Sequence, residues 1–146
     1  MNIEKLINKI TNETIIKLKK TKLLKDNKKI TTFNKTENIL KNYNNYLKAI
    51  EIDKNGTIET QKLIHKINEA LKTIENDEYY SIIEMIYFQG KSREYVAEFY
   101  DVEVKTITRN KHRLINKLKV ILFSDESILE IYDIWQQVIY FEHKNA

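Results

Sequence analysis

The residues best suited to chemistry form a run of cations between Val104 and Lys119. This stretch has no acid and contains six basic residues: Lys105, Arg109, Lys111, Arg113, Lys117 and Lys119. The preceding stretch, 75–103, holds eight acids and two cations, so a basic island follows an acidic region. Clustered lysines and arginines neutralise phosphates, and the planar arginine fork can bind a guanine edge through two hydrogen bonds. The charge pattern therefore favours nucleic-acid binding over ordinary solvation of a helix face.

Composition excludes several other kinds of chemistry. The chain has 146 residues with no cysteine, no proline and two glycines, which rules out disulfides, thiolate metal sites and a glycine-rich phosphate loop. No carboxylates pair in a pattern typical of acid–base catalysis, and none of the three histidines has a second ligand at metal spacing. We therefore expect a protein that is not an enzyme and carries no cofactor or metal.

One segment has part of the spacing of a calcium-binding loop. Glu51, Asp53 and Asn55 are followed by Gly56 in the order of the first ligands of an EF-hand. The twelfth position, which needs a bidentate carboxylate, is Lys62, and a cation there opposes metal binding. The segment is better explained as a turn between two helices.

Apolar periodicity predicts an all-α helical bundle, with no convincing strand and no internal repeat. Helices are expected over 3–29 (one or two helices), from caps at 31–34 to about 50, and over 58–74, 78–88, 92–100, 104–123 and 124 onward. Three regions follow: a lysine-rich helical region (1–74), a DNA-binding domain (75–123) and a C-terminal amphipathic helix (124–146). The lysines between 17 and 29 fit either a solvated helix face or a patch that tracks phosphates.

The stretch 83–118 has the sequence logic of a helix-turn-helix. Gly90 can end one helix, Ser92 can cap the next, and Ala97 is small enough for two helices to cross closely. Val102 is expected to fill the angle between the helices. The inward-facing residues are expected to be Tyr95, Val96 and Phe99 on the first helix, and Ile107, Leu114, Leu118 and Ile121 on the second.

Helical geometry then assigns roles to the outward residues. The residues expected to read base edges in a major groove are Lys105, Thr108, Arg109 and His112. The residues expected to hold phosphates are Ser92, Arg93, Thr106, Lys111 and Arg113. The predicted partner is double-stranded DNA.

These residues resemble a known family. The runs 86–99, 106–109 and 113–118, with Val102 between the first two, are similar to the helix-turn-helix of sigma-factor region 4. Together with 34–37 and 67–71 they resemble the ArpU/RinA group of phage late-gene transcriptional regulators, over roughly residues 31–122. The resemblance implies a phage or prophage activator. The chain departs from the pattern at Glu103, where a serine-like cap is usual, and in the extension from Ser124.

Alternatives of other kinds remain open. A sigma-like subunit bound to RNA polymerase, or a small terminase subunit reading a packaging site, shares the motif, and a helical interaction protein needs no DNA. The last helix is apolar over more of its circumference than a solvated helix needs, so it is expected to dock on its own domain or on a second copy in a homodimer. No apolar run approaches the roughly 18 residues of a membrane span. We therefore expect a cytoplasmic protein with no membrane segment.

Overall fold

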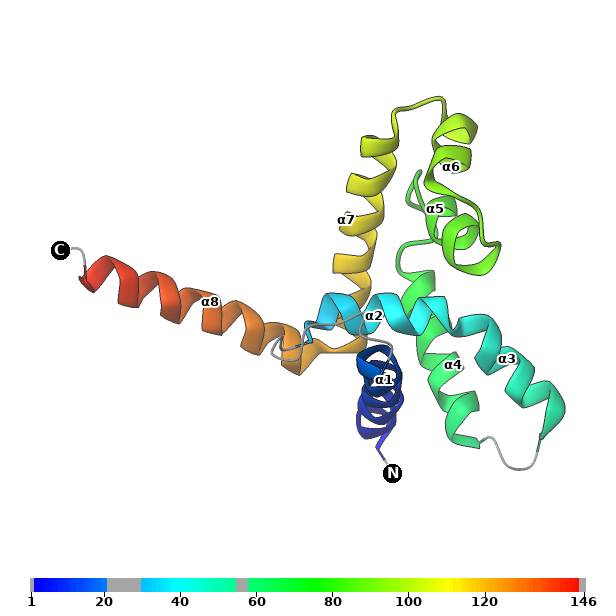
Figure 1. Cartoon of the computed structure of the whole chain (residues 1–146), viewed down its shortest axis with the longest axis horizontal. Coiled ribbons are helices and arrows are strands. Elements are labelled where there is room, and N and C mark those ends of the chain that lie inside the picture. The colour runs from blue at the N-terminus through cyan, green and yellow to red at the C-terminus, as the bar shows by residue number, and fades with distance from the viewer. Residues whose placement is uncertain (1, 21–29, 55–57, 145–146) are drawn as a thin grey trace.

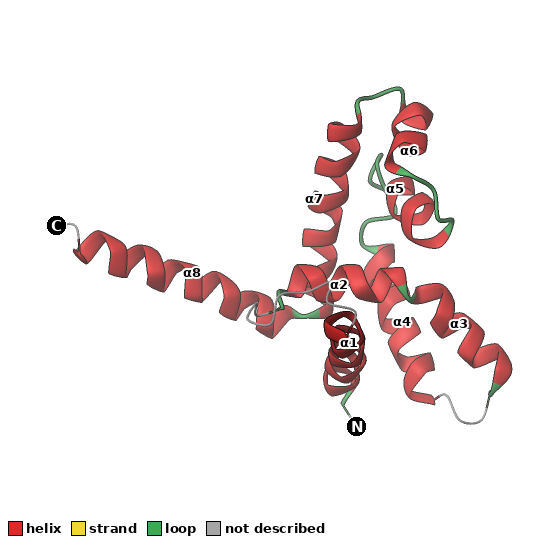
Figure 2. Ribbon diagram, in the orientation of Figure 1, coloured by secondary structure: helices red, strands yellow, loops and turns green. Residues whose placement is uncertain are grey.

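A computed structural model describes residues 2–20, 30–54 and 58–144. Across these ranges the chain forms helices and turns and no strand, which confirms the all-α prediction (Figure 2). The elements are α1 (Ile3–Lys20), α2 (Thr32–Lys41), α3 (Tyr43–Ile52), α4 (Ile58–Lys72), α5 (Ser81–Ile83), the π-helical turn η1 (Glu84–Phe88), α6 (Arg93–Tyr100), α7 (Val104–Leu122) and α8 (Ser124–Lys144).

The main core lies where α1, α2, α4 and the second half of α7 meet. The stripe predicted on α4 is buried, including Leu63, Ile67 and Leu71. Against it pack Ile7 from α1 and Ile39 from α2, and the same cluster contains Leu114, Leu118 and Leu122 of α7. Residues of the ranges 1–74 and 75–123 thus share one apolar core.

A smaller core holds α5, η1, α6 and the first turns of α7 together. It consists of Ile82, Met85, Val96, Ala97 and Ile107, all buried. The expected contacts of Val96, Ala97 and Ile107 are confirmed. Helix α7 contributes to both cores and so connects them. Helix α6 lies beside the N-terminal end of α7, at the top of Figure 1.

The helix expected over about 34–50 is divided at Asn42. The Asn42 side-chain amide donates to the carbonyl oxygen of Asn38 at 2.8 Å, and its backbone has φ −98° and ψ 2°. An asparagine side chain that binds a nearby backbone carbonyl offers the chain an alternative to continuing the helix. The chain therefore changes direction between α2 and α3 (Figure 1).

The helix expected over 78–88 begins only at Ser81 and ends in the wider π-helical turn η1. Gly90 follows with φ +69°, the left-handed conformation that ends many helices. The amide of Lys91 donates to the carbonyl oxygen of Met85 at 2.8 Å across this end. Gly90 thus ends the helix as predicted.

The last helix begins at Ser124, as predicted, and then leaves the rest of the molecule (Figure 1). Ser127 is its buried residue. The apolar side chains from Ile128 to Phe141 are exposed, with Trp135 at 61% and Phe141 at 68%. Docking of α8 on its own domain, one of the two expectations, is therefore not what the described structure shows.

Some expectations fall on residues outside the described ranges. They are most of the lysine run between 17 and 29, and Asn55 and Gly56 of the calcium-like loop. Within the described part of the chain, no cluster of three histidine or acidic side chains is placed to hold a metal ion. No helix there is long and apolar enough to cross a membrane.

Two backbone positions give a reciprocal test of this fold. A Cβ at Gly90 would meet no atom within 4 Å, so Gly90→Ala causes no clash. The substitution should lower the unfolding free energy by about 1 kcal/mol, because alanine disfavours the left-handed backbone conformation at this position. Asp101 has φ 54° and bears a side chain there, so Asp101→Gly should raise stability by about 0.5–1 kcal/mol. Urea denaturation measures both. Equal stability of Gly90→Ala and the parent chain would contradict the assigned conformation.

Candidate nucleic-acid interface

A short turn joins α6 to α7. The Ser92 hydroxyl caps α6 by accepting a hydrogen bond from the Tyr95 amide at 3.1 Å. At the other end Asp101 adopts the left-handed conformation, and the Val102 amide donates to the carbonyl oxygen of Ala97 at 3.0 Å. These bonds satisfy the helix end and reverse the chain within residues 101–103. The predicted helix boundaries at 92–100 and 104 are confirmed to within one residue.

Glu103 occupies the cap position of α7 without capping it. Its backbone is extended, and its side chain makes no hydrogen bond to the first turn. The carboxylate instead lies 3.1 Å from the Lys105 ammonium, with both side chains more than 70% exposed. The departure from a serine-like cap therefore leaves the start of α7 where it was predicted and gives Lys105 an exposed partner.

The outward face of α7 brings together three of the four predicted base-reading residues. Lys105, Arg109 and His112 are spaced four and three residues apart and are exposed. Within the described residues, Arg109 makes no ion pair. Thr108 is half-buried beside this face, and its hydroxyl accepts a hydrogen bond from Arg93 at 3.2 Å. This bond places the first residue of α6 against α7.

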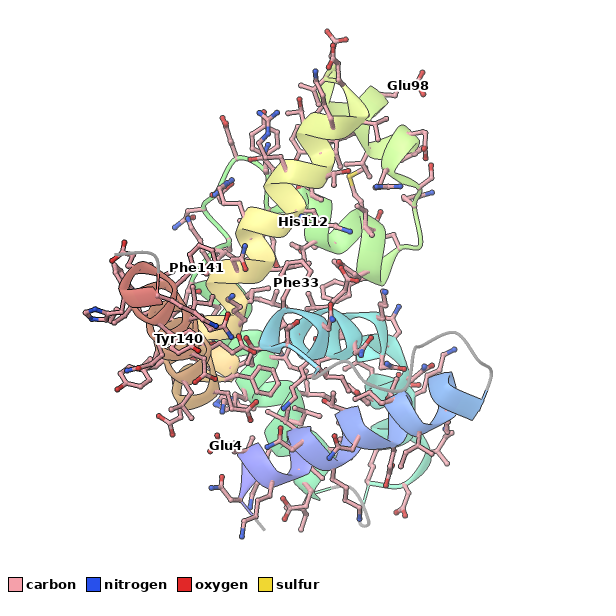
Figure 3. All side chains as sticks on the ribbon, turned by 60° about the vertical axis from the view of Figure 1, so that its left-hand side comes forward. Glu4, Phe33, Glu98, His112, Tyr140 and Phe141 are labelled. Carbon is pink, nitrogen blue, oxygen red and sulfur yellow. The ribbon has the colours of Figure 1, made fainter. Side chains whose placement is uncertain are left out.

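His112 is partly committed to the fold. Its ring meets the ring of Phe33 from α2 edge-on, with 5.2 Å between the centroids (Figure 3). Two turns separate it from Lys105, so it lies toward the main core rather than at the free end of α7. Lys105 and Arg109 are exposed and lie nearer the start of α7 than His112 does.

Two predicted phosphate-binding residues are instead held in ion pairs within the chain. Arg113 donates to both oxygens of Asp77, at 2.7 and 2.8 Å, and to the Asn110 side chain at 3.2 Å. Lys111 is only 15% exposed and lies 3.6 Å from Glu37. Both partners lie far away in the sequence. Arg113 and Lys111 therefore anchor α7 to its neighbours, which leaves them less available to a phosphate than the other predicted ligands.

The same ion pairs perturb the acids that make them. Hydrogen bonds from Arg113 lower the pKa of Asp77 to about 2, against the opposing effect of partial burial. Burial raises the pKa of Glu37, but hydrogen bonds from Tyr87 and Lys41 outweigh it and leave that pKa below its ordinary value. Both carboxylates are thus held ionised beside α7.

The outer face of α6 is more apolar than predicted. Tyr95 and Phe99 were expected to face inward, but they are 48% and 63% exposed, and Ile121 of α7, also expected to face inward, is 38% exposed. The Lys91 ammonium lies 4.8 Å from the centre of the Tyr95 ring. In a helix of eight residues only Val96 and Ala97 are buried, which leaves two aromatic rings, one turn apart, on the outside.

Three of the remaining predicted residues sit at the junction of the two helices. Ser92 and Arg93 are exposed at the start of α6, and Thr106 is half-buried in the first turn of α7. Lys91, which the sequence analysis did not select, is exposed just before them. Hydrogen-bond donors and cations thus gather around the start of α6 and the outward face of α7, which suits an anionic polymer better than a small molecule.

The ion pair of Asp77 should be visible in the pH dependence of stability. The folded pKa of Asp77 lies near 2, below its unfolded value of about 3.9, so its stabilisation is present above pH 4 and lost as the pH falls toward 2. Asp77→Asn should therefore lower the unfolding free energy by about 1 kcal/mol at pH 7, with the difference vanishing near pH 2. Urea titrations across this range measure it. Glu98→Gln, on the exposed face of α6, is the control, and a pH-independent difference for Asp77→Asn would contradict the pairing.

Comparison of the chain with protein-family models, with curated proteins and with solved structures finds no match.

Proposed function

We propose that the protein binds double-stranded DNA sequence-specifically, with α6 and α7 acting as a helix-turn-helix and α7 as its recognition helix. The observation that carries the proposal is the contrast between two arginines of α7. Arg113 is bound by Asp77, whereas Arg109 is exposed and, within the described residues, has no acidic partner. An unneutralised arginine on the outward face of a firmly anchored helix is suited to a partner that supplies acceptors.

In this proposal the first turns of α7 enter the major groove. Arg109 presents two parallel N–H donors that match the O6 and N7 acceptors of guanine. Lys105 lies one turn earlier on the same face. Its ammonium contacts a neighbouring base, or it leaves its ion pair with Glu103 and binds a phosphate instead. Thr108 and His112 border the same surface and read bases at its edges. The ion pairs of Arg113 and Lys111 keep this helix at a fixed angle.

The start of α6 supplies the phosphate contacts. In helix-turn-helix proteins the first helix of the motif crosses the DNA backbone. Arg93, held beside α7 by its bond to Thr108, and Ser92 lie at that helix start, with Thr106 nearby. The partial positive charge of the α6 N-terminus adds to the attraction for a phosphate.

The resemblance to the ArpU/RinA group extends the proposal to a role. It suggests a transcriptional regulator of phage or prophage late genes, acting in the cytoplasm. A sigma-like subunit would in addition bind RNA polymerase. In vitro transcription with core polymerase, with and without a host sigma factor, separates a regulator from a subunit.

The role of Arg109 is tested on a site selected from random duplex DNA. Arg109→Ala should weaken binding to the selected site by about 1–3 kcal/mol, roughly 5- to 150-fold, because one base loses its bidentate partner. Binding to unselected duplex should fall much less. Fluorescence anisotropy at fixed salt measures both affinities.

Lys48→Ala is the matched control, because it removes one exposed cation from α3, away from the proposed surface. Equal loss on selected and random DNA for Arg109→Ala would refute base reading by Arg109. No binding of the unmodified protein to any duplex at about 50 mM salt would refute DNA binding and favour a helical interaction protein.

A phosphate role for Arg93 has a different signature. Arg93→Ala should weaken binding to selected and random duplexes alike and reduce the slope of log affinity against log salt by about 1. Arg93→Lys keeps the charge and should keep the slope. An unchanged slope in Arg93→Ala would remove Arg93 from the proposed interface.

A further inference from the structure

Helix α8 exposes a broad apolar face that the rest of the described chain leaves uncovered. Ten of its apolar side chains are 44–68% exposed, and Figure 3 shows Tyr140 and Phe141 near its outer end. At about 150–250 Å² for a buried aromatic side chain, this face offers on the order of 1,000 Å² of apolar surface. Monomers rarely expose contiguous apolar patches above a few hundred Å². An exposed apolar face of this size is typical of a surface that binds another molecule.

The base of α8 is held by polar contacts. The Glu130 carboxylate accepts hydrogen bonds from the amide and the hydroxyl of Thr32, at 2.8 and 2.7 Å, at the start of α2. Lys35 donates to Glu126 at 2.7 Å, and the Ser127 hydroxyl donates to the carbonyl oxygen of Lys119 at 3.3 Å. The direction of α8 is thus set at its root, while its apolar length remains available for a second molecule.

The spacing of the apolar residues suits helix-to-helix packing. Ile128, Tyr132, Trp135 and Ile139 follow one another at intervals of four, three and four residues. A second series, Ile131, Ile134, Val138 and Phe141, follows at three, four and three. Alternation of three and four is the repeat of helices that pack along their length. Two adjacent series give a face about half the helix wide.

The charges of α8 distinguish an antiparallel partner from a parallel one. Its first turn carries two acids, Asp125 and Glu126, whereas its last turn carries His143 and Lys144 together with one acid, Glu142. Asp125 and His143 lie 18 residues apart, which is five turns of 3.6 residues, so both project on the same side. A second α8 running antiparallel places each acidic first turn beside a last turn in which His143 and Lys144 outnumber the single acid. A parallel copy places acids beside acids.

We propose that α8 pairs antiparallel with α8 of a second copy of this chain, with the two-fold axis near Ile134 and Trp135. An isologous pair uses the same face twice, as this self-complementary charge order requires. The available area is comparable to the roughly 800 Å² per partner of a standard stable interface. This pairing goes beyond the proposed DNA binding and does not depend on it.

The mass of the full chain in the absence of DNA tests the pairing. Light scattering at about 10 µM should give a dimer, and Trp135→Glu should raise the dimer dissociation constant at least tenfold, because it places a charge at the centre of the interface. Gln137→Glu, two residues away on the polar side of α8, is the control and should leave the dimer intact. A monomeric parent chain, or a Trp135→Glu variant that dimerises like the parent, would overturn the proposal.

Because the chain lacks cysteine, single cysteines report the orientation cleanly. Trp135→Cys lies at the proposed axis and should form an intermolecular disulfide under mild oxidation, since bridged Cα atoms must lie within about 7 Å. Ile128→Cys should not cross-link, because in the antiparallel pair its two copies are separated by about 20 Å along the helix. Efficient cross-linking of Ile128→Cys would show a parallel pair and overturn the proposed arrangement.

Discussion

The bidentate pair between Arg113 and Asp77 is the contact on which the geometry of α7 depends. It joins the middle of α7 to the turn after α4 through two short hydrogen bonds, and Lys117 adds its charge 3.8 Å from the same carboxylate. Apolar packing alone would permit small rotations of a helix about its axis, whereas two directed bonds to one planar carboxylate do not. The rotation of α7 decides which residues face outward, so this pair, together with the buried side chains of α7, keeps Arg109 on the outward face.

Glu37 makes a second anchor from the opposite side of α7. Its carboxylate accepts the Tyr87 hydroxyl at 2.8 Å and lies near Lys111 and Lys41. It thereby links α2, η1 and α7 at the boundary between the main core and the small core. The two acids divide the basic island: the cations that meet Asp77 or Glu37 stabilise the fold, and those at the free end of α7 remain available to a partner.

Helix periodicity and local caps made much of the fold predictable. The stripe on α4 and the start of α7 depend on residues within a few positions of each other, which the sequence displays directly. The partners of Arg113 and Lys111 lie 36 and 74 residues away, so no local pattern reveals them. The prediction for Tyr95 and Phe99 was wrong for another reason. These two rings lie one turn apart on one face of the two-turn helix α6, and the core takes the other face through Val96 and Ala97.

The start of α7 and the length of α8 present opposite chemistry to the solvent. At the free end of α7 the exposed groups are charged or polar, and water hydrates them well. Along α8 ten exposed side chains between Ile128 and Phe141 are large and apolar, and their contact with water is unfavourable. Thr32 and Lys35 nevertheless hold the root of α8 in place. The first turns of α8 are fixed by directed hydrogen bonds while its apolar face is exposed, and this combination is the basis of the proposed pairing with a second copy. In the proposed dimer, the direction of α8 would set where the second α7 lies.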